Sequence, residues 1–267
     1  MADKAILYDA TKCMACRGCQ VACKQWYDLP GELTTNRGTY ENPPDLSFDT
    51  WLKMRFTEIG DTPENLRWLF ARRACMHCTD AACIEVCPTK ALYHHETGLV
   101  AYKRELCTGC GYCVEACPFD VPRSGGGVGG MVHGVRTINK CILCEDRITN
   151  GEEPACVKTC PTGALTYGDR SNLLADGQAR VASLKSTYHN SYLYGEKELN
   201  GLHVLYVLDD SPDVYGLPVN PQIPIAATVW QDVLQPIGWG LAGLVALGLG
   251  VNYVIARRKI KINSEEE

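Results

Sequence analysis

The chain has 267 residues, 16 cysteines and a formal net charge of −5. Its length suggests one large or two small domains. The acidic balance argues against nucleic-acid binding, because such proteins present a dominant basic surface. An even number of cysteines permits a disulfide framework, so the positions of the cysteines decide how they are interpreted.

The N-terminal residues 1–8 contain no apolar core and no twin arginine, so we expect no signal peptide. Residues 5–9 predict a short strand that leads into the first group of cysteines. This first group is Cys13, Cys16, Cys19 and Cys23. Its first three members recur every third residue, and Lys24 follows the fourth. Because no proline stands there, we expect a helix to continue through residues 25–27.

Residues 28–64 are rich in Pro, Gly, Asn and Asp, which predicts an insertion between modules that contributes no core. The insertion carries the aromatic residues Tyr40, Phe48 and Trp51. These side chains either pack the loop down or face a partner, since aromatic residues are enriched at interfaces. The sequence leaves both alternatives open. Residues 66–70 then predict a strand.

The second group of cysteines is Cys75, Cys78, Cys83 and Cys87. The third group, which follows a strand predicted at residues 99–103, is Cys107, Cys110, Cys113 and Cys117. A proline follows each group directly. The third run has the spacing with which bacterial ferredoxins hold a cubane [4Fe–4S] cluster, and its fourth cysteine binds a different cluster. His77 lies inside the second loop, where we predict a loop residue and not a ligand, because four thiolates are already available.

The fourth group of cysteines is Cys141, Cys144, Cys156 and Cys160, with a small excursion inside its loop. The stretch after it, residues 161–167, repeats the pattern of residues 88–93 after the second group. This internal repeat indicates a duplicated βαβ ferredoxin unit. The Gly-rich stretch 125–130 predicts a flexible loop. A phosphate cradle is the alternative there, but no Lys-Ser/Thr pair follows.

Every cysteine falls into one of these four groups of four, which favours four [4Fe–4S] clusters over disulfides or zinc. Six basic residues lie beside these cysteines: Lys12, Arg17, Lys24, Lys140, Arg147 and Lys158. We expect them to offset cluster charge, which raises a reduction potential. Clusters with four cysteine ligands have no open iron, and no complete catalytic motif is visible. The chain therefore indicates an electron-transfer protein and not an enzyme.

Residues 172–187 predict an amphipathic helix and residues 202–208 a strand, and the proline-rich stretch 212–224 predicts an extended linker. Residues 236–256 then carry no charge. As a helix they would span roughly 31 Å at about 1.5 Å per residue, which matches a bilayer core. Trp239 and Tyr253 lie near the two ends, as membrane aromatic belts do. A buried core helix is the alternative interpretation.

With these motifs in place, the chain resembles the four-cluster iron–sulfur subunits of the molybdopterin oxidoreductase family. Among them it is most similar to the beta subunits of membrane-bound formate dehydrogenases. The resemblance rests on 40–46, 54–56, 75–78, 153–163, 203–208 and 216–218, followed by one terminal helix. It implies an α+β fold with two tandem bacterial-ferredoxin-like (βαβ)2 modules, interdigitated in sequence, plus one C-terminal transmembrane helix.

The resemblance also implies which groups share a module. Residues 1–27 and 137–170 form the first module and residues 66–124 the second. Residues 28–65 are the insertion, 171–224 the connecting segment, and 225–267 the anchor with its tail. Because each fourth cysteine binds the neighbouring cluster, the expected ligand sets cross between groups. They are Cys13, Cys16, Cys19 with Cys160; Cys23 with Cys141, Cys144, Cys156; Cys75, Cys78, Cys83 with Cys117; and Cys87 with Cys107, Cys110, Cys113.

By the same resemblance, the partners are a molybdopterin catalytic (alpha) subunit with Mo or W and a cytochrome b (gamma) subunit in the lipid bilayer. The expected function is electron transfer from formate oxidation towards the quinone pool in anaerobic respiration. The alternative is the corresponding subunit of a hydrogenase or of a sulfur-compound or sulfoxide reductase. Basic residues directly follow the apolar span and are missing before it, so we expect a cytoplasmic C-terminus and a periplasmic cluster domain.

Overall fold

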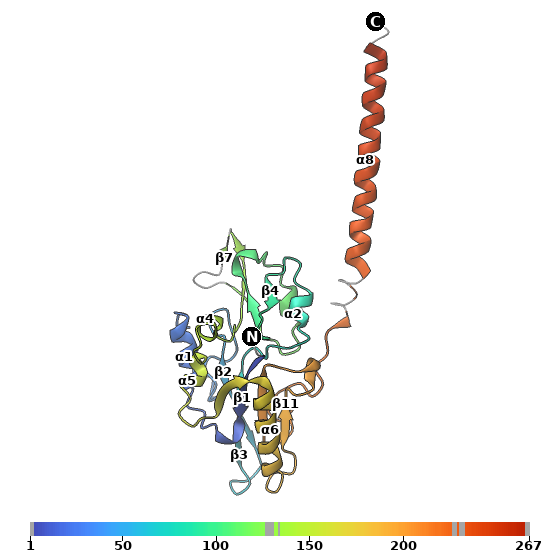
Figure 1. Cartoon of the computed structure of the whole chain (residues 1–267). Helices are drawn as coiled ribbons and strands as arrows, with labels where there is room; N and C mark the ends of the chain where they lie inside the picture. Colours follow the sequence, from blue (N-terminus) through green and yellow to red (C-terminus); the bar gives the residue numbers. More distant parts are fainter. Residues whose placement is uncertain (1–2, 126–130, 133, 226–228, 230–232, 265–267) are drawn as a thin grey trace. The chain divides into compact units, whose positions relative to one another are not determined.

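The computed structural model describes residues 3–125, 131–132, 134–225, 229 and 233–264 (Figure 1). Contacts divide the chain into two compact units, Met1–Ile223 and Pro224–Glu267, and each is described by itself. In the Gly-rich stretch only Gly125 is described, and its N–H donates to the carbonyl of Thr137 at 2.8 Å. Residues 126–130 of that predicted loop lie outside the described residues, as do residues 265–267 of the tail.

A mixed sheet of four strands organises the first unit. Its strands are β1 (Lys4–Asp9), β10 (Leu165–Asp169), β11 (Tyr192–Tyr194) and β12 (Val204–Leu208), in the order β10-β1-β12-β11. β1 runs antiparallel to β10 and parallel to β12, and β11 runs antiparallel to β12. The strands predicted at residues 5–9 and 202–208 are therefore direct neighbours in this sheet.

Both faces of β12 are buried, which explains why its sequence is a continuous apolar run. Leu205 and Val207 pack on one face against α6 (Arg170–Leu184), the amphipathic helix expected from the sequence. Val204 and Tyr206 belong to the core on the other face, together with many of the cysteines. Alternation of side chains along the strand thus separates a helix-covered layer from the cysteine-bearing core. In Figure 1, α6 lies alongside β1 and β11.

An antiparallel hairpin of β2 (Lys53–Ile59) and β3 (Arg67–Arg73) packs onto that second face. Tyr8 and Tyr206 reach it from the sheet. The hydroxyl of Tyr8 donates to the carbonyl of Phe70 at 2.7 Å, and that of Tyr206 donates to the carbonyl of Arg72 at 2.6 Å. These two hydrogen bonds hold the backbone of β3 against the sheet.

The hairpin corrects the expectation that residues 28–65 add nothing to the core. Strand β2 lies inside this stretch, and Leu52 and Met54 are buried. Among the aromatic residues, Phe48 and Trp51 are buried and pack the loop down, whereas Tyr40 stays exposed beside Trp68. Local turn composition described the loop well, but it could not show that a later part of the stretch pairs with β3.

Short elements accompany the cysteine groups. The helices are α1 (Gly18–Trp26), α2 (Ala82–Glu85), α3 (Tyr112–Ala116), α4 (Glu145–Thr149) and α5 (Ala155–Lys158). The paired strands are β4 (Leu92–His94) with β5 (Val100–Tyr102), β6 (Arg123–Ser124) with β9 (Ile138–Asn139), and β7 (Met131–Val132) with β8 (Val135–Arg136). The 3₁₀ helices are η1 (Ala10–Lys12), η2 (Arg104–Leu106) and η3 (Glu198–Asn200).

Two helix contacts join distant parts of the chain. α1 contacts α5, and α2 contacts α3. The first contact brings the first cysteine group next to the fourth, and the second brings the second group next to the third. In Figure 1, α1, α4 and α5 lie together, and α2 lies near β4.

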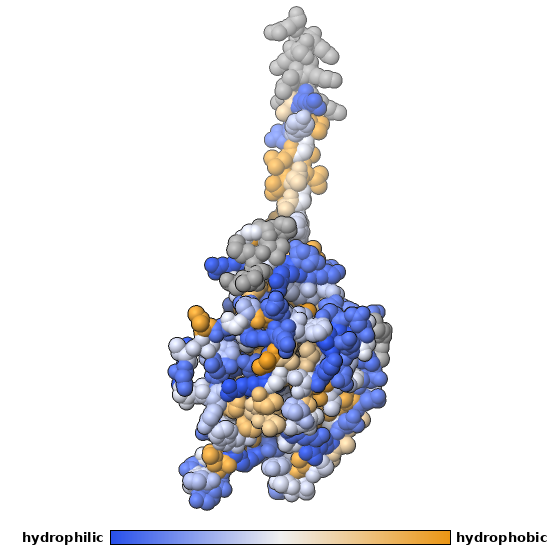
Figure 2. All heavy atoms as spheres, turned by 90° about the vertical axis from the view of Figure 1, so that its left-hand side faces the viewer, coloured by the Kyte–Doolittle hydropathy of each residue, from blue (hydrophilic) through white to orange (hydrophobic). Residues whose placement is uncertain are grey.

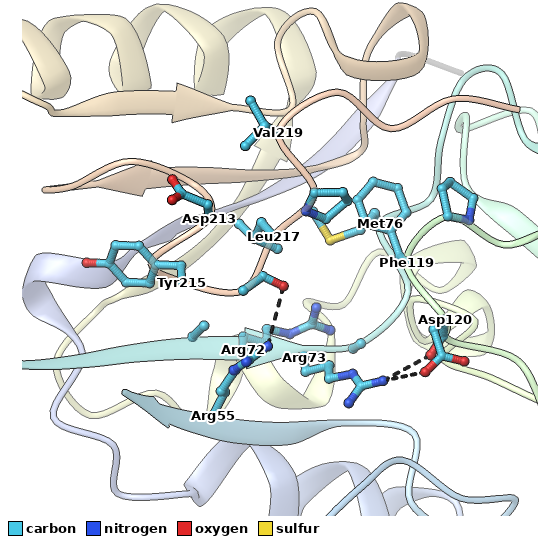
Figure 3. Close-up of a pocket in the computed structure, with 15 residues that line it drawn as sticks. Arg55, Arg72, Arg73, Met76, Phe119, Asp120, Asp213, Tyr215, Leu217 and Val219 are labelled. Atoms are coloured by element: carbon cyan, nitrogen blue, oxygen red, sulfur yellow. Dashed lines mark hydrogen bonds and ion pairs between the residues drawn. The ribbon is translucent and has the colours of Figure 1, made fainter. Parts of the chain in front are cut away.

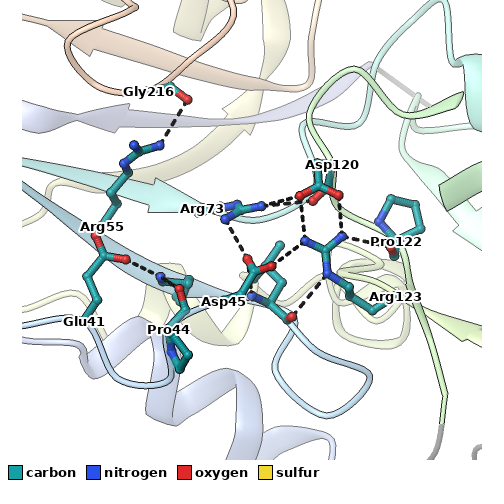
Figure 4. Close-up of polar contacts among 11 residues, drawn as sticks. Glu41, Pro44, Asp45, Arg55, Arg73, Asp120, Pro122, Arg123 and Gly216 are labelled. Atoms are coloured by element: carbon teal, nitrogen blue, oxygen red, sulfur yellow. Dashed lines mark hydrogen bonds and ion pairs between the residues drawn. The ribbon is translucent and has the colours of Figure 1, made fainter. Parts of the chain in front are cut away.

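Ion pairs fasten the inserted stretch to the rest of the unit (Figure 4). Asp45 of the insertion binds Arg73 at 2.6 Å and Arg123 at 2.9 Å. Asp120 closes the network by binding the same two arginines, at 2.8 and 2.7 Å. Arg123 also donates to the carbonyl of Leu46 at 3.2 Å. Together these contacts join the insertion, β3 and the start of β6.

The predicted linker at 212–224 is packed at its start, which the sequence did not indicate. Tyr215 is buried, and its hydroxyl donates to a carboxylate oxygen of Asp209. In the second unit, α8 (Gln235–Ser264) contains the predicted apolar span. Residues Gln235–Arg257 are long and apolar enough to cross a membrane, with a mean hydropathy of 1.7, and none of that window is buried. Figure 2 shows apolar residues gathered along this helix.

Candidate metal centres

All four cysteine groups begin with the same backbone turn. The residue two positions after the first cysteine has a positive φ in every group: Ala15 (53°), His77 (49°), Gly109 (67°) and Leu143 (55°). A left-handed backbone is costly for residues other than glycine, so it persists only where the surroundings impose it. At Gly109 a glycine is also required by space, because a Cβ would lie 2.0 Å from the carbonyl oxygen of Arg136.

This turn points a backbone N–H at the first cysteine sulfur. The N–H groups of Ala15 and Gly109 lie 3.4 Å from Cys13 Sγ and Cys107 Sγ, and that of Leu143 lies 3.5 Å from Cys141 Sγ. In the second group, burial raises the pKa of Cys75, while Lys140 and the backbone N–H of His77 lower it. Such donors stabilise a thiolate and are one means of tuning an iron–sulfur cluster.

One enclosed cavity is lined by four cysteines, Cys13, Cys16, Cys19 and Cys160. Three of them come from the first group and one from the end of the fourth. Thr162, two residues after the last of these cysteines, lies with its hydroxyl 3.8 Å from that sulfur. The fold thus brings the first cysteine group together with Cys160, which is far from it in the sequence, at this cavity.

A second enclosed cavity is lined by Cys87, Cys107, Cys110 and Cys113. Here one cysteine comes from the end of the second group and three from the third. Thr89 lies two residues after Cys87 and so corresponds to Thr162, and its hydroxyl is 3.8 Å from Cys87 Sγ. The repeat seen in the sequence therefore has the same local arrangement at both cavities.

The remaining eight cysteines fall into two further neighbourhoods. Burial first, and then the thiolates of Cys141, Cys156 and Cys144, raise the pKa of Cys23. Likewise, burial first, and then the thiolates of Cys75, Cys83 and Cys117, raise the pKa of Cys78. A neighbouring thiolate has this effect only when it lies close by. In both neighbourhoods the last cysteine of one group lies near the first three of another.

The donor set suits a cluster better than a single ion. Within the described residues, which include every cysteine, no three Cys, His, Asp or Glu side chains are close enough to hold one metal ion. In a cubane each thiolate binds a different iron, so the four sulfurs stand apart around the cube. Burial raises the pKa of Cys19 to about 12, and that of Cys144 to about 12. Such thiols stay protonated at neutral pH unless positive iron stabilises the thiolate.

Exposure differs among the four neighbourhoods. Cys16 and Cys110 are exposed, and each lines one of the two cavities. By contrast, Cys23 and the three cysteines near it are all buried. The neighbourhood of Cys78 is intermediate, since Cys75 and Cys83 are buried. Two neighbourhoods thus reach the surface of the unit, and two lie further inside.

The six basic residues singled out in the sequence range from exposed to fully buried. Lys12 approaches Asp9 at 3.9 Å, Arg147 pairs with Glu152 at 2.8 Å, and Lys158 is exposed. Arg17 stacks over Phe56 at 5.0 Å, and the ammonium of Lys24 donates to carbonyl oxygens. Two of the six are buried: Arg147 is 5% exposed, and Lys140, at 1%, donates to the carbonyls of Val100 and Cys141, at 2.6 and 3.0 Å.

Sequence reasoning missed Arg72, which is 1% exposed on β3. Its Nη2 lies 3.9 Å from Cys141 Sγ, and its side chain also lines the cavity of Cys13 and Cys160. The sequence feature that could have indicated it is the pair Arg72–Arg73 at the end of an apolar strand. Because side chains alternate between the two faces of a strand, one of two successive residues must point inwards.

His77 is fully buried. Its Nδ1 accepts the N–H of Val100 at 3.0 Å, and its carbonyl accepts a hydrogen bond from His203 Nδ1 at 2.7 Å. Burial, and next the positive charge of Lys140, lower the pKa of His77, so the ring is neutral. The position matches that of the other turn residues, as expected for a loop residue.

A further cavity, of about 570 Å³, lies beside β3 and the turn at residues 213–219, and no cysteine lines it (Figure 3). Arg55, Arg73 and Asp120 contribute charged groups, and Phe119 and Leu217 contribute apolar surface. Arg73 binds Asp120, and Arg55 donates weakly to the carbonyl of Gly216 at 3.4 Å. Arg72 also lines this cavity.

Comparisons with known proteins agree with the cysteine pattern. Residues 66–170 match the family model described as 4Fe-4S dicluster domain. The chain is 39% identical to the formate dehydrogenase iron-sulfur subunit of Haemophilus influenzae, covering 97% of this chain and 83% of that protein. It is 42% identical to the formate dehydrogenase-O iron-sulfur subunit of Escherichia coli K12, over 88% and 77%. It is also 31% identical to the hydrogenase-2 operon protein HybA of Escherichia coli O157:H7, over 91% and 83%.

Proposed function

The chain belongs to the family of formate dehydrogenase iron–sulfur subunits, and from this membership we propose how its cysteines divide among four cluster sites. It is an electron-transfer subunit of an oxidoreductase complex, carries [4Fe–4S] clusters and is not itself catalytic. When bound, such a cluster takes up and releases single electrons at a potential that its surroundings set.

The proposed ligand sets cross between the cysteine groups. Cys13, Cys16 and Cys19 bind one cluster with Cys160, and Cys141, Cys144 and Cys156 bind its neighbour with Cys23. In the other half, the sets are Cys75, Cys78, Cys83 with Cys117, and Cys107, Cys110, Cys113 with Cys87. The two enclosed cavities support the first and last of these sets, because each is lined by those four cysteines. The mutual electrostatic effects of the thiolates support the other two.

We also propose that these sets form two ferredoxin-like modules, residues 1–27 with 137–170 and residues 66–124. The helix contacts α1–α5 and α2–α3 support this division, since each joins the two cysteine groups of one module. The modules share one compact unit, Met1–Ile223, which also includes residues 28–65 and the connecting segment 171–223.

The observation that carries the proposed order of the clusters is the exposure of the ligands. Cys16 and Cys110 are exposed, and the set around Cys23 is buried. Electrons must enter and leave where cluster ligands reach the surface, so the sets with Cys16 and Cys110 are the two ends. The buried set around Cys23 and the less exposed set around Cys78 then hold clusters between these ends.

In this proposal the donor is a molybdopterin catalytic subunit that oxidises formate, and it docks at the end near Cys16. The acceptor is a membrane cytochrome b that passes electrons to quinone, and it docks at the end near Cys110. Relatives named as formate dehydrogenase subunits support this substrate. The hydrogenase-2 operon protein HybA is a relative of lower identity, 31%, so hydrogen is the second candidate donor.

We further propose that Gln235–Arg257 crosses the membrane with the C-terminus in the cytoplasm. The length and hydropathy of this segment support a span. Arg257, Arg258, Lys259 and Lys261 support the orientation, since positive residues stay on the cytoplasmic side. The cluster-bearing unit then lies on the periplasmic face.

The test is anaerobic reduction of the purified complex, followed by electron paramagnetic resonance and by absorbance of the haem. Formate should reduce the clusters and then a b-type haem, and the isolated subunit should oxidise no formate. If formate leaves the clusters oxidised while hydrogen or a sulfur compound reduces them, the formate assignment is wrong.

A further inference from the structure

Arg72 combines complete burial with incomplete hydrogen bonding. It is 1% exposed, and within the described residues its Nε and Nη1 have no hydrogen-bond partner. A buried, unpaired donor on a charged group is costly, so such groups require an explanation. A cysteine sulfur lies within reach, since Nη2 is 3.9 Å from Cys141 Sγ.

The guanidinium touches two of the proposed ligand sets. It lines the cavity of Cys13, Cys16, Cys19 and Cys160. Its contact with Cys141 belongs to the neighbouring set, which also includes Cys23. Arg72 therefore stands at the junction of two cluster sites of the first module.

The thiolates respond to this charge. Burial raises the pKa of Cys156, and Arg72 is the strongest opposing influence on it. Burial also disfavours the charged guanidinium, but the thiolates of Cys156 and Cys141 outweigh that effect, and the pKa of Arg72 is raised. Arginine stays protonated in proteins in any case, so the positive charge is permanent.

The backbone at Arg72 is held firmly. Its carbonyl accepts the hydroxyl of Tyr206 at 2.6 Å, and Phe70, two residues earlier, accepts that of Tyr8 at 2.7 Å. Both tyrosines are fully buried on the central sheet. The guanidinium is thus supported by a rigid strand and not by a loop.

We propose that Arg72 is a positioning residue that bridges the two clusters of the first module and raises their reduction potentials. This inference rests on the crossed ligand sets proposed above. Reduction adds negative charge to a cluster, and a fixed positive charge stabilises the reduced form more than the oxidised form. The fork of N–H donors adds hydrogen bonds to sulfur, which act in the same direction.

Arg73 provides a matched control on the same strand. Successive strand residues point to opposite faces, and Arg73 binds Asp45 and Asp120 at the surface with 28% exposure (Figure 4). Replacing either arginine by glutamine removes one positive charge, and the two positions are adjacent on the strand. Only the change at Arg72 should act on the clusters.

The experiment is a redox titration of the full chain with its co-purifying subunits, monitored by electron paramagnetic resonance. Arg72→Gln should lower the equilibrium constant for one-electron reduction of first-module clusters about tenfold or more, which corresponds to about 59 mV. Arg72→Lys keeps the charge but loses the fork, so its shift should be smaller. Arg73→Gln should leave all potentials at wild-type values, and in Arg72→Gln the cluster of the set with Cys110 should stay at its wild-type potential. The charge of Arg72 also lowers the pKa of Cys75, so the set with Cys75 is not used as a control.

If Arg72→Gln does not assemble its clusters, Arg72→Lys is compared with Arg73→Lys. Only Arg72→Lys should then lower the reduction potential of a first-module cluster. Potentials at Arg72 variants that equal those of the Arg73 variants would overturn the inference. A wild-type chain with fewer than four clusters would instead contradict the proposed ligand sets. The two failures are therefore distinguishable.

Discussion

Cys160 lies beside Cys13 in the folded chain, on the wall of one cavity that Cys16 and Cys19 also line. The thiolate of Cys160 is close enough to raise the pKa of Cys13, after burial and against two opposing hydrogen bonds. The last cysteine of the fourth group thus completes the set begun by the first group. This relationship distinguishes crossed ligand sets from four independent sites.

The crossing predicts which substitutions remove the same cluster. Cys160→Ala should abolish the same electron paramagnetic resonance signal as Cys16→Ala, because both cysteines line one cavity. Cys156→Ala should abolish a different signal, that of the neighbouring cluster. Thr162→Ala removes only a hydroxyl 3.8 Å from Cys160 Sγ and should keep all signals. If Cys160→Ala and Cys156→Ala remove the same signal, the sets do not cross.

The core around β12 predicts that replacing two different leucines by alanine has different effects on the stability of the unit. Leu205 is 0% exposed between the sheet and α6, whereas Leu33 is 107% exposed. Leu205→Ala should destabilise the unit by about 2–5 kcal/mol, because it deletes buried methyl groups and leaves a cavity. Thermal loss of the visible cluster absorbance should move to lower temperature for Leu205→Ala and stay unchanged for Leu33→Ala. Equal behaviour of the two variants would contradict the described core.

The network at Asp45 predicts protection of the insertion from proteolysis (Figure 4). Asp45→Asn should speed tryptic cleavage at the exposed Arg37, because Arg73 and Arg123 lose a shared partner. Asp176→Asn, on the exposed side of α6, should leave the cleavage rate unchanged.

The pH dependence of that protection follows from the lowered pKa of Asp45. Burial raises it, but the hydrogen bonds from Arg123 and the Leu46 N–H and the charge of Arg73 lower it below its usual value of 3.8. A depressed folded-state pKa stabilises the network above the unfolded pKa and ceases to do so as the pH falls through the folded value. The difference between wild type and Asp45→Asn should therefore stay constant from about pH 8 down to about pH 5 and shrink only below about pH 4. A difference that grows on acidification would argue against this network.

The orientation of the anchor predicts which end of the chain is accessible. In intact spheroplasts, a tag on Glu267 should resist added protease, while the cluster-bearing unit is cleaved or labelled. A chain that ends at Asp232 should leave the membrane if no other subunit holds it. A cytoplasmic cluster-bearing unit would show that the charge argument is wrong and would favour a reductase facing the cytoplasm.

Local patterns were predictable because they depend on few neighbours. Spacing identified every cysteine loop, apolar periodicity identified α6, and a continuous apolar run identified β12. The membrane-length segment of α8 was equally clear from composition.

Long-range pairing was not predictable in the same way. Strand β2 ends a stretch rich in turn residues, and only its register with β3 makes Met54 a core residue. The inward turn of Arg72, and not Arg73, depends on which face of β3 meets the sheet. Likewise, Tyr215 lies in the proline-rich stretch 212–224 but is buried, and its hydroxyl donates to Asp209. These features belong to packing between distant segments, which local sequence does not encode by itself.

Iron and acid-labile sulfide analysis of the anaerobically purified full chain tests the four-cluster assignment most directly. All sixteen cysteines lie in the four neighbourhoods, and none of them forms a disulfide. Four cubanes require about sixteen irons and about sixteen sulfides per chain, with no stoichiometric zinc. A value near eight irons, or zinc in stoichiometric amount, would contradict the account.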